Sequence, residues 1–510
     1  MRPLFALTLF LFVSMSPAVA QDYVGSDTCR DCHTDATDAW EGSHHALAWT
    51  AATPDNIVAD FDNTEFLHDG TTTRFRIEEG DYYINVTEKD GVTTDYKVHS
   101  VAGIEPLQQY LLETEPGQIQ SFDVVWDTVE QEWFHLYPEQ DLPPDDGLHW
   151  TGPYKNWNAR CAECHATGFE KNYNPAERTY ASMQAEIGVG CEACHGPGSA
   201  HLNWATGKAP AEPFTGLTEY GLTIDNSAGG EVVLQQCATC HSRREAHFDG
   251  NPLPGTPYAD AYNLALLRPG SYHADGQILD EVYVYGSFLQ SKMYAKGVTC
   301  SNCHDAHTAE LKAEGNGVCT QCHAPAGNPA FPTLANTLYD DPSHHFHEAG
   351  TEGAQCKSCH MIERVYMGVD GRRDHSFRIP RPDLSIETNS PNSCTDCHAD
   401  KSSAWAAAAV EGWYPDSVNR GLHYGQTLAA GRLDAVAAKG SLAELAENTQ
   451  EPGIVRATAL WLLEKAQDPQ MATRLEPLLD DPDVVVRTAA VGLHSFAAPQ
   501  LRGQRLERVL

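Results

Sequence analysis

The sequence predicts a mainly α-helical protein with large irregular content, a small inserted antiparallel β subdomain and a C-terminal α-solenoid. Three observations predict this fold class. Sixteen cysteines stand in short repeated motifs, a segment near the N-terminus alternates apolar and polar residues, and alanine and leucine dominate the C-terminal part. We therefore expect a cysteine-rich domain over residues 21–400, a β subdomain inserted in it over residues 55–140, and a helical domain over residues 401–510.

The first twenty residues have the regions of a secretory signal peptide. Arg2 supplies a positive start, residues 4–13 are apolar, and Ala-Val-Ala ends at Ala20. The apolar run is too short to span a bilayer, and no later stretch is apolar enough for a transmembrane helix. We expect cleavage after Ala20 and an exported protein, in the periplasm or beyond it, whose mature chain has no transmembrane segment.

All sixteen cysteines belong to Cys-x-x-Cys-His motifs. Zinc sites and redox dithiols also use Cys-x-x-Cys, but neither requires a histidine after every second cysteine. In covalent c-type haem, two thiols bond to one porphyrin edge and the following histidine binds the iron. The sequence therefore predicts eight haems with iron ligands at the motif histidines. The motifs are Cys29-Cys32-His33, Cys161-Cys164-His165, Cys191-Cys194-His195, Cys237-Cys240-His241, Cys300-Cys303-His304, Cys319-Cys322-His323, Cys356-Cys359-His360 and Cys394-Cys397-His398.

The motifs leave few residues per haem to build a protein core. We expect the haems to form much of the interior, with short helices at the motifs and loops wrapped around them. Only fourteen residues, 305–318, separate motifs five and six. That short connection predicts that their two haems lie nearly in contact.

The long segment between motifs one and two predicts the β subdomain. Its centre, TRFRIEEGDYYINVTEKDGVTTDYKVHSV, alternates residue types and contains the turn signals EEGD and KDG. Such a pattern is typical of antiparallel hairpins. FDVVWD and EWFHLY predict further strands.

The C-terminal domain contains a repeated pattern. Residues 451–463 and 481–493 align Arg456 with Arg487 at a period of 31 residues. The pattern resembles HEAT-type α-solenoid repeats, with an ordinary helical bundle as the alternative. The chain ends where a further repeat would begin, so we expect the array to be truncated or completed by a partner.

The second axial position of each iron decides what the protein can do. A second imidazole there makes a closed iron suited to electron transfer, whereas an open position permits chemistry. Sixteen histidines lie outside the motifs. His344 and His347 share one segment with His345, and His135 and His149 are reserve candidates. The expected second ligands are His45, His99, His201, His247, His273, His307, His345 and His375.

Several stretches resemble known families. CRDCHTDATDAWEGSHHALAW and NARCAECHATGF resemble the cytochrome c-552/c-554 type of multihaem domain. HADGQILDEVYVYGSFLQSKMYAKGVTCSNCHDAHTAEL is similar to multihaem cytochromes with C-terminal TPR or HEAT repeats. The resemblance covers residues 23–415 and implies a multihaem cytochrome c core and periplasmic electron transfer. It also implies that the histidine of a Trp-x-x-Ser-x-His pattern is a second iron ligand, which favours His45 over His44.

The net charge of −36 makes nucleic acid and anionic lipid poor partners, and it favours basic proteins as redox partners. We expect an electron carrier with separate donor and acceptor proteins. The alternative is an octahaem oxidoreductase acting at one open haem on small nitrogen or sulfur compounds of the hydroxylamine, nitrite and tetrathionate class. A third alternative is a scaffold built on the repeat domain. The basic residues that could hold an anion, or instead neutralise haem propionates, are Arg160, Arg243, Arg244, Arg372, Arg373 and Lys296. The sequence identifies neither a catalytic residue nor an oligomeric state.

Overall fold

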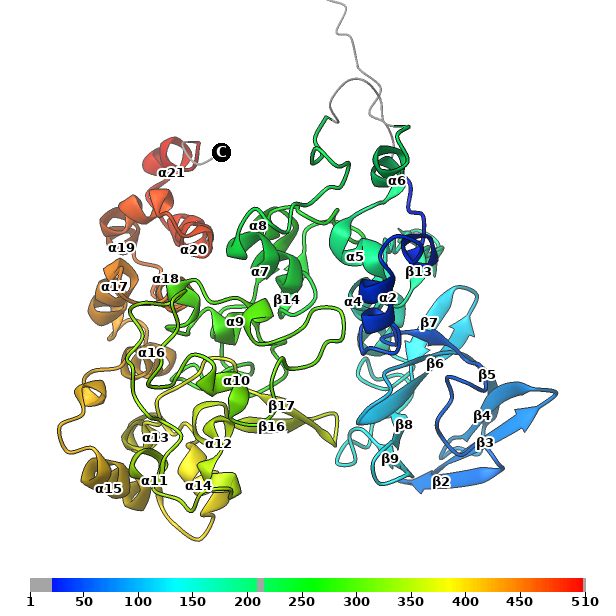
Figure 1. Cartoon of the computed structure of the whole chain (residues 1–510), viewed down its shortest axis with the longest axis horizontal. Helices are drawn as coiled ribbons and strands as arrows, with labels where there is room; N and C mark the ends of the chain where they lie inside the picture. The colour runs from blue at the N-terminus through cyan, green and yellow to red at the C-terminus, as the bar shows by residue number, and fades with distance from the viewer. Residues whose placement is uncertain (1–20, 209–214, 508–510) are drawn as a thin grey trace, which may run out of the picture.

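A β-sheet and a group of C-terminal helices flank a central region of short helices and loops (Figure 1). This computed structural model describes residues 21–208 and 215–507. The predicted signal peptide, residues 1–20, lies outside the described residues. In the described part of the chain, no helix is long and apolar enough to cross a membrane.

The sheet is antiparallel and has nine strands. Its main path is β2-β3-β4-β5-β6-β8-β9, with β1 beside β5 and β7 beside β6. The strands are β1 (Thr50–Ala51), β2 (Thr64–His68), β3 (Thr71–Glu78), β4 (Asp81–Thr87), β5 (Thr93–Ala102), β6 (Leu107–Glu115), β7 (Gln118–Ser121), β8 (Val124–Asp127) and β9 (Glu132–His135). The hairpins expected from the alternating segment are therefore present, and so are the two further strands.

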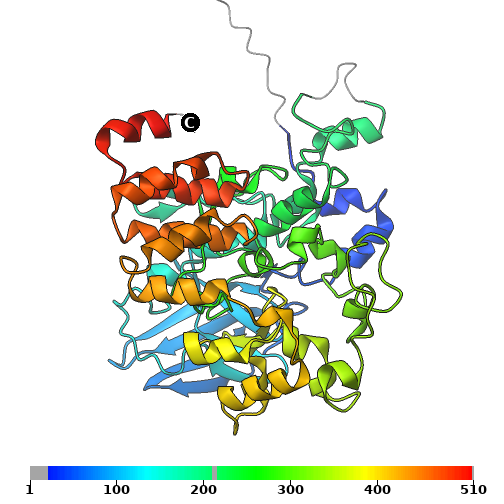
Figure 2. The same cartoon turned by 90° about the vertical axis from the view of Figure 1, so that its left-hand side faces the viewer.

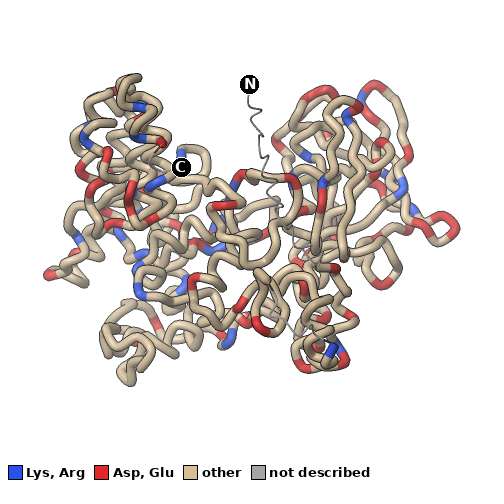
Figure 3. Tube along the Cα trace, turned by 90° about the horizontal axis from the view of Figure 1, so that it is seen from above, with Lys and Arg blue, Asp and Glu red and all other residues tan. Residues whose placement is uncertain are grey.

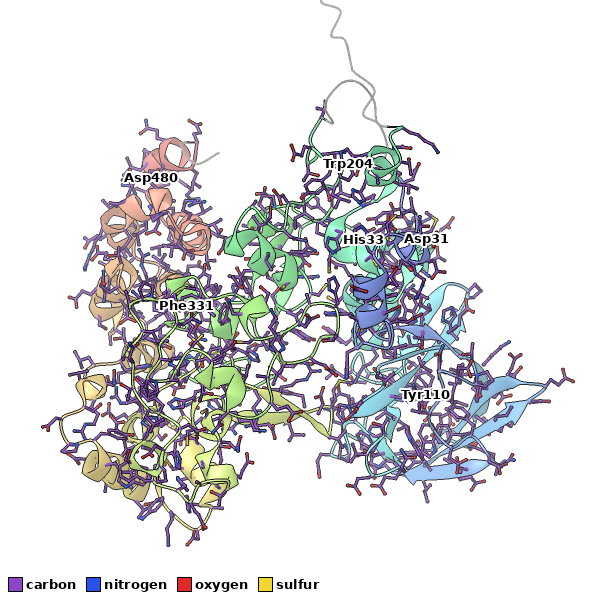
Figure 4. All side chains as sticks on the ribbon, viewed as in Figure 1. Asp31, His33, Tyr110, Trp204, Phe331 and Asp480 are labelled. Atoms are coloured by element: carbon purple, nitrogen blue, oxygen red, sulfur yellow. The ribbon has the colours of Figure 1, made fainter. Side chains whose placement is uncertain are left out.

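Alternation along each strand builds the core of the sheet. In β4, Tyr82, Ile84 and Val86 are buried and the residues between them are partly exposed. Together with Tyr110, labelled in Figure 4, they belong to one apolar cluster. The sheet curls so that its edge strands β2 and β9 meet, and the indole of Trp133 in β9 donates to the Asp60 carbonyl just before β2 (3.2 Å).

Most central helices are only one or two turns long. They are α1 (Ser26–Cys29), α2 (Thr34–Trp40), η1 (Pro153–Lys155), α3 (Trp157–Arg160), α4 (Ala162–His165), α5 (Cys191–His195), α6 (Ser199–Ala205), α7 (Gly230–Ala238), α8 (Tyr258–Ala261), α9 (Tyr285–Phe288), η2 (Tyr294–Lys296), η3 (Cys300–Asn302), α10 (Gly317–Thr320), α11 (Pro342–His345), η4 (Glu352–Ala354), α12 (Cys356–His360), α13 (Pro382–Thr388) and α14 (Ser393–Cys397). Four two-stranded antiparallel sheets lie between them: β10 (Ala166–Thr167) with β13 (Glu186–Ile187), β11 (Tyr173–Asn174) with β12 (Thr179–Tyr180), β14 (Arg244–Ala246) with β15 (Tyr262–Leu264), and β16 (Glu363–Tyr366) with β17 (Asp370–Arg373).

The prediction of a mainly α-helical protein is wrong, because the structure is mixed. Each motif forms about one helical turn and then leads into irregular chain, so the many helices contribute little length. The nine-stranded sheet adds more regular β structure than a small subdomain implies.

The C-terminal helices lie one above another (Figure 2). They are α15 (Ser403–Trp413), η5 (Val418–Arg420), α16 (Tyr424–Leu433), α17 (Lys439–Glu447), α18 (Gly453–Glu464), α19 (Pro469–Arg474), η6 (Glu476–Asp480), α20 (Val484–His494) and α21 (Pro499–Leu506). The apolar faces of α16 to α21 share one core with residues 258–289 of the central region. The HEAT-type repeat stays a prediction.

Candidate haem sites

One large cavity runs through the central region and contacts every motif. Its volume is about 3580 Å³, several times the roughly 300–1,000 Å³ of an ordinary ligand pocket. At least one cysteine and the histidine of each of the eight motifs line it. None of the sixteen cysteines is in a disulfide. A cavity that joins all the motifs fits a set of prosthetic groups packed against one another.

Local helical hydrogen bonding gives the motifs their shape. In motifs one, four, five, six and eight, the histidine N–H donates to the carbonyl of the first cysteine at 2.8–2.9 Å. This bond closes one helical turn, so both cysteines and the histidine face the same side. That side is the cavity.

Histidines outside the motifs face motif histidines across the cavity. Two imidazoles that bind one metal ion from opposite sides, through bonds of about 2 Å, have ring centroids about 6 Å apart. Five pairs have this spacing: His33 with His201 (6.2 Å), His45 with His241 (6.2 Å), His304 with His375 (6.4 Å), His344 with His360 (6.3 Å) and His347 with His398 (6.2 Å). Figure 4 labels His33 just before α2. The spacing leaves room for one metal ion between the rings of each pair.

Backbone carbonyls orient these imidazoles. His45, His201 and His375 contact the carbonyls of Ala306, Tyr220 and Arg373 through Nδ1, at 2.9–3.2 Å. His347 and the motif histidine His360 make the same kind of contact. When Nδ1 carries the proton and donates it, Nε2 is left as the metal-binding atom.

Burial favours the neutral form of several of these histidines. The pKa of His241 is lowered to about 4, chiefly by burial and in smaller part by the nearby His45 and Arg372. Burial also lowers the pKa of His360 and His375. The neutral imidazole is the form that binds a metal ion.

Some predicted second ligands lie elsewhere. The structure brings His344 and His347, rather than the predicted His345, opposite motif histidines. His99 is exposed on β5, and His247 is exposed beside Phe248. His273 lies in a turn closed by Gln277, and His307 is near the ring of His195. Within the described ranges, no imidazole pair of the spacing above includes His165, His195 or His323.

Comparisons with known proteins agree with the motifs. Residues 28–76 and 148–196 match the family model "Cytochrome c554 and c-prime", and residues 292–328 match the model "Doubled CXXCH motif". The chain is a multihaem c-type cytochrome. No curated protein sequence matches it.

Two solved structures are similar to this cytochrome. The outer cell wall cytochrome OcwA has 16% sequence identity to it and a TM-score of 0.51, over 93% of this chain and 99% of that one. The octaheme sulfite reductase MccA of Wolinella succinogenes has 14% identity and a TM-score of 0.36, over 96% of this chain and 84% of that one. The similarity to OcwA supports the fold.

The motifs of the cytochrome contact one another in a definite order. The Cys29 thiol lies next to that of Cys191, which brings motifs one and three together. Thiol contacts likewise join motifs two and four, four and five, and six and seven, and thiols of motifs three and four, five and six, and seven and eight lie near each other. Motif four therefore lies beside motifs two, three and five. The series of neighbouring motifs branches there, with motif two on one branch and motifs three and one on the other.

Most of the predicted basic residues in the cytochrome have local structural partners. Arg244 pairs with Glu163 (3.1 Å) and packs on Tyr262. Arg243 donates to the Glu281 carbonyl (2.7 Å), and Arg373 pairs with Glu363 (2.8 Å). Arg160 lies over Tyr154, and Lys296 ends η2 and lines the cavity.

Arg372 points into the cavity near Tyr283 and Glu281. In the sequence, Arg372 is one of six basic residues near motifs, and Tyr283 and Glu281 carry no signal of a functional role. No motif or spacing distinguishes these two residues, because their position depends on a loop that lies far from motif two in sequence.

Proposed function

We propose that this chain is an exported electron-transfer cytochrome that binds eight c-type haems and passes electrons along them. The observation that carries this proposal is the set of five imidazole pairs with ring centroids 6.2–6.4 Å apart. Haem iron held by two imidazoles changes oxidation state without changing ligands. Such sites carry electrons and do not expose the metal to a substrate.

The protein's own residues prepare each site. The motif cysteines hold the porphyrin edge, and the motif histidine binds from one side. The second histidine comes from a distant segment and is fixed by a carbonyl at Nδ1, as in His201 and Tyr220 (2.9 Å). Because these rings are already oriented, little rearrangement accompanies a change of iron charge.

The contacts between motifs support a branched electron path. A linear series runs from motif eight through seven, six and five to motif four. There it divides, with one branch to motifs three and one and another to motif two. Electron tunnelling weakens exponentially with distance, so neighbouring haems along this series exchange electrons fastest.

The C-terminal helices and the acidic surface serve partner proteins in this proposal. The stacked helices lie at one side of the central region (Figure 1), and a HEAT-like repeat would extend their outer face. The excess of Asp and Glu over Lys and Arg favours a basic electron donor or acceptor. The expected location is the periplasm or the cell exterior.

Mass spectrometry and redox titration of the purified holoprotein test the proposal. We expect eight covalently added haems, no free thiol at the sixteen cysteines, and reversible reduction of every haem without a substrate. Fewer than eight haems, or disulfides between these cysteines, would contradict it.

A further inference from the structure

The cavity wall beside motif seven contains an arginine without an ion pair. The backbone N–H of Arg378 donates to the carbonyl of the motif histidine His360 (3.0 Å), and the Arg378 carbonyl accepts from His360 Nδ1 (2.7 Å). Eight arginines line the cavity. Within the described residues, six of them pair with a carboxylate, and only Arg160 and Arg378 do not. Arg160 is exposed, whereas Arg378 is partly buried, so Arg378 is the enclosed positive charge that the protein leaves unpaired.

Neighbouring side chains hold the guanidinium of Arg378 in place. Its Nη2 donates to Gln290 Oε1 (2.7 Å), and the same oxygen accepts from the Tyr424 hydroxyl (3.0 Å). Gly276 permits this packing, because a Cβ at its position would lie 2.7 Å from Nη2. The central region and α16 therefore fix this guanidinium together.

The acidic residues around Arg378 have other partners. Asp275 and Asp374 are buried nearby, and their carboxylates accept from backbone N–H groups at 2.8–3.2 Å. Neither lies within ion-pair distance of the guanidinium, which has five N–H groups. Arg378 can therefore bind a further acceptor from the cavity side.

The start of α16 adds a second donor to this wall. His423 lines the cavity near Arg378, and its Nδ1 accepts from the Gly425 N–H (3.0 Å). Burial, then Arg378, lower the pKa of His423 to about 4, so the ring is neutral. Because Nδ1 is the acceptor, the ring proton is on Nε2. His423 therefore presents a hydrogen-bond donor rather than a metal-binding nitrogen.

The haem predicted at motif seven carries an acceptor of the matching kind. A c-type haem has two propionate carboxylates, on the side of the porphyrin away from its thioether bonds, and an enclosed carboxylate needs a paired charge or hydrogen bonds. Both imidazoles of the pair at this motif contact the segments around the wall. His360 contacts Arg378, and His344 contacts Tyr414, which follows α15.

We propose that Arg378 and His423 bind a propionate of the haem at motif seven, so that the C-terminal helices complete a haem site. The inference rests on the proposed function, because it requires a haem at Cys356 and Cys359. It gives α16 a role inside the redox core, in addition to any contact of the C-terminal helices with a partner. Since reduction adds an electron to the iron, the positive charge of Arg378 stabilises the reduced haem.

Potentiometric titration of the holoprotein tests the site. A unit charge about 10 Å from an iron changes its reduction equilibrium by about tenfold at an effective dielectric constant of about 20. Arg378→Gln should therefore lower one midpoint potential by about 59 mV, which corresponds to tenfold for one electron. Arg378→Lys keeps the charge and should lower it less. Arg74→Gln is the matched control, because it removes the same charge from an exposed ion pair with Glu65 on the sheet. It should leave every midpoint potential unchanged.

A second variant and a structure make the test specific. His423→Ser retains a residue type that caps helices but removes the ring N–H. It should change the reduction equilibrium of the same haem by severalfold, and it keeps the test valid if Arg378→Gln does not fold. A crystal structure of the holoprotein should show a propionate of the haem at motif seven on Arg378 and His423.

The outcomes separate this inference from the proposed function. Titration curves of Arg378→Gln and His423→Ser that superimpose on the wild type would overturn the inference. So would an equal shift in Arg378→Lys and Arg378→Gln, or a holoprotein structure in which Arg378 contacts no propionate or that of another haem. Each of these results leaves an electron carrier with eight haems standing. Fewer than eight haems by mass would reject the proposed function itself.

Discussion

At the scale of single residues, neighbouring histidines in one segment have different roles. His344 faces the motif histidine His360 with ring planes 6° apart. The Tyr414 hydroxyl donates to the His344 carbonyl (2.5 Å) and lies 2.8 Å from its Nδ1, so Nδ1 can donate to the hydroxyl oxygen. His345, next in sequence, accepts a hydrogen bond from the His347 backbone at its Nδ1 instead. Geometry therefore favours His344 as an iron ligand.

This difference predicts the outcome of two adjacent substitutions. His344→Ala should convert one haem from low-spin to high-spin, because it removes the second imidazole at motif seven. His345→Ala, the matched control, should leave all spin states as in the wild type. Absorption and electron paramagnetic resonance spectra of the two holoproteins measure this. If a new high-spin haem appears only in His345→Ala, then His345 and not His344 is the iron ligand.

The motif histidines could be predicted from the sequence as iron ligands, but the histidine opposite each of them could not. Cysteine spacing fixes where a haem attaches because the attachment is local to one helical turn. The second ligand is set by tertiary contacts: His45 faces His241, and His33 faces His201, across more than 150 residues in each case. Nothing in local spacing encodes such a pairing. The same reason explains why the sequence does not distinguish Arg378 and why His345 was preferred to its neighbours.

At the scale of secondary structure elements, a pair of histidines joins the edges of the sheet. His68 in β2 stacks on His135 in β9, with ring centroids 4.4 Å apart. Burial, and in smaller part the neighbouring His68, lower the pKa of His135 to about 4. Both strands are edge strands of the sheet path, so this contact helps to hold the curled sheet together.

The pair predicts that the sheet edge loosens in acid. The pKa of His135 in the folded state lies below the roughly 6.5 of an unperturbed histidine, so the unfolded state binds more protons. The stabilising contribution is therefore complete above about pH 6.5 and is lost as the pH falls toward 4. Hydrogen exchange, corrected for intrinsic rates, should be faster at pH 5 than at pH 7 in peptides covering β2 and β9. His135→Gln should remove this difference, and β6 in the middle of the sheet should not change. Equal protection of β2 at both pH values in the wild type would refute the prediction.

A buried ion pair links two of the stacked C-terminal helices. Arg456 of α18 binds Asp481, which precedes α20, at 2.6 Å, and both side chains are 5% exposed. Arg456 also donates to the Ala446 carbonyl of α17 (2.9 Å), so it connects α17, α18 and the residues just before α20. The repeated pattern aligns Arg456 with Arg487, but Arg487 makes different contacts: it donates to the Asp481 and Pro482 carbonyls just before its own helix.

Arg456→Met should destabilise these helices by about 3–5 kcal/mol, because it leaves the Asp481 carboxylate buried without its partner. Arg474→Met is the control, since Arg474 pairs with Glu447 at the surface and an exposed pair contributes about 0–1 kcal/mol. Denaturant unfolding followed by far-ultraviolet circular dichroism measures both. If the two variants lose similar free energies of unfolding, the buried ion pair contributes no more to stability than the exposed one.

At the scale of the whole molecule, charge and the arrangement of the motifs act together. Asp and Glu residues are distributed over both the sheet side and the helical side of the chain (Figure 3). The branched series of motif contacts ends at motifs one, two and eight, which lie in different parts of the sequence. An electron donor and an acceptor can therefore dock at separate ends while sharing one negatively charged surface.

Electron exchange with small reagents should follow the sign of the reagent's charge. The net charge of −36 attracts cations and repels anions over a distance set by the Debye length, which shrinks from about 30 Å at 0.01 M salt to about 3 Å at 1 M. Oxidation of the reduced cytochrome by hexaammineruthenium(III), a cation, should slow by about tenfold or more over this range. Oxidation by ferricyanide, an anion, should accelerate over the same range. Stopped-flow absorption measures both rates on one preparation, so a general effect of salt on the protein would move them in the same direction. If both rates fall, or if neither rate changes, the negative charge of the acidic residues does not govern electron exchange at the haems.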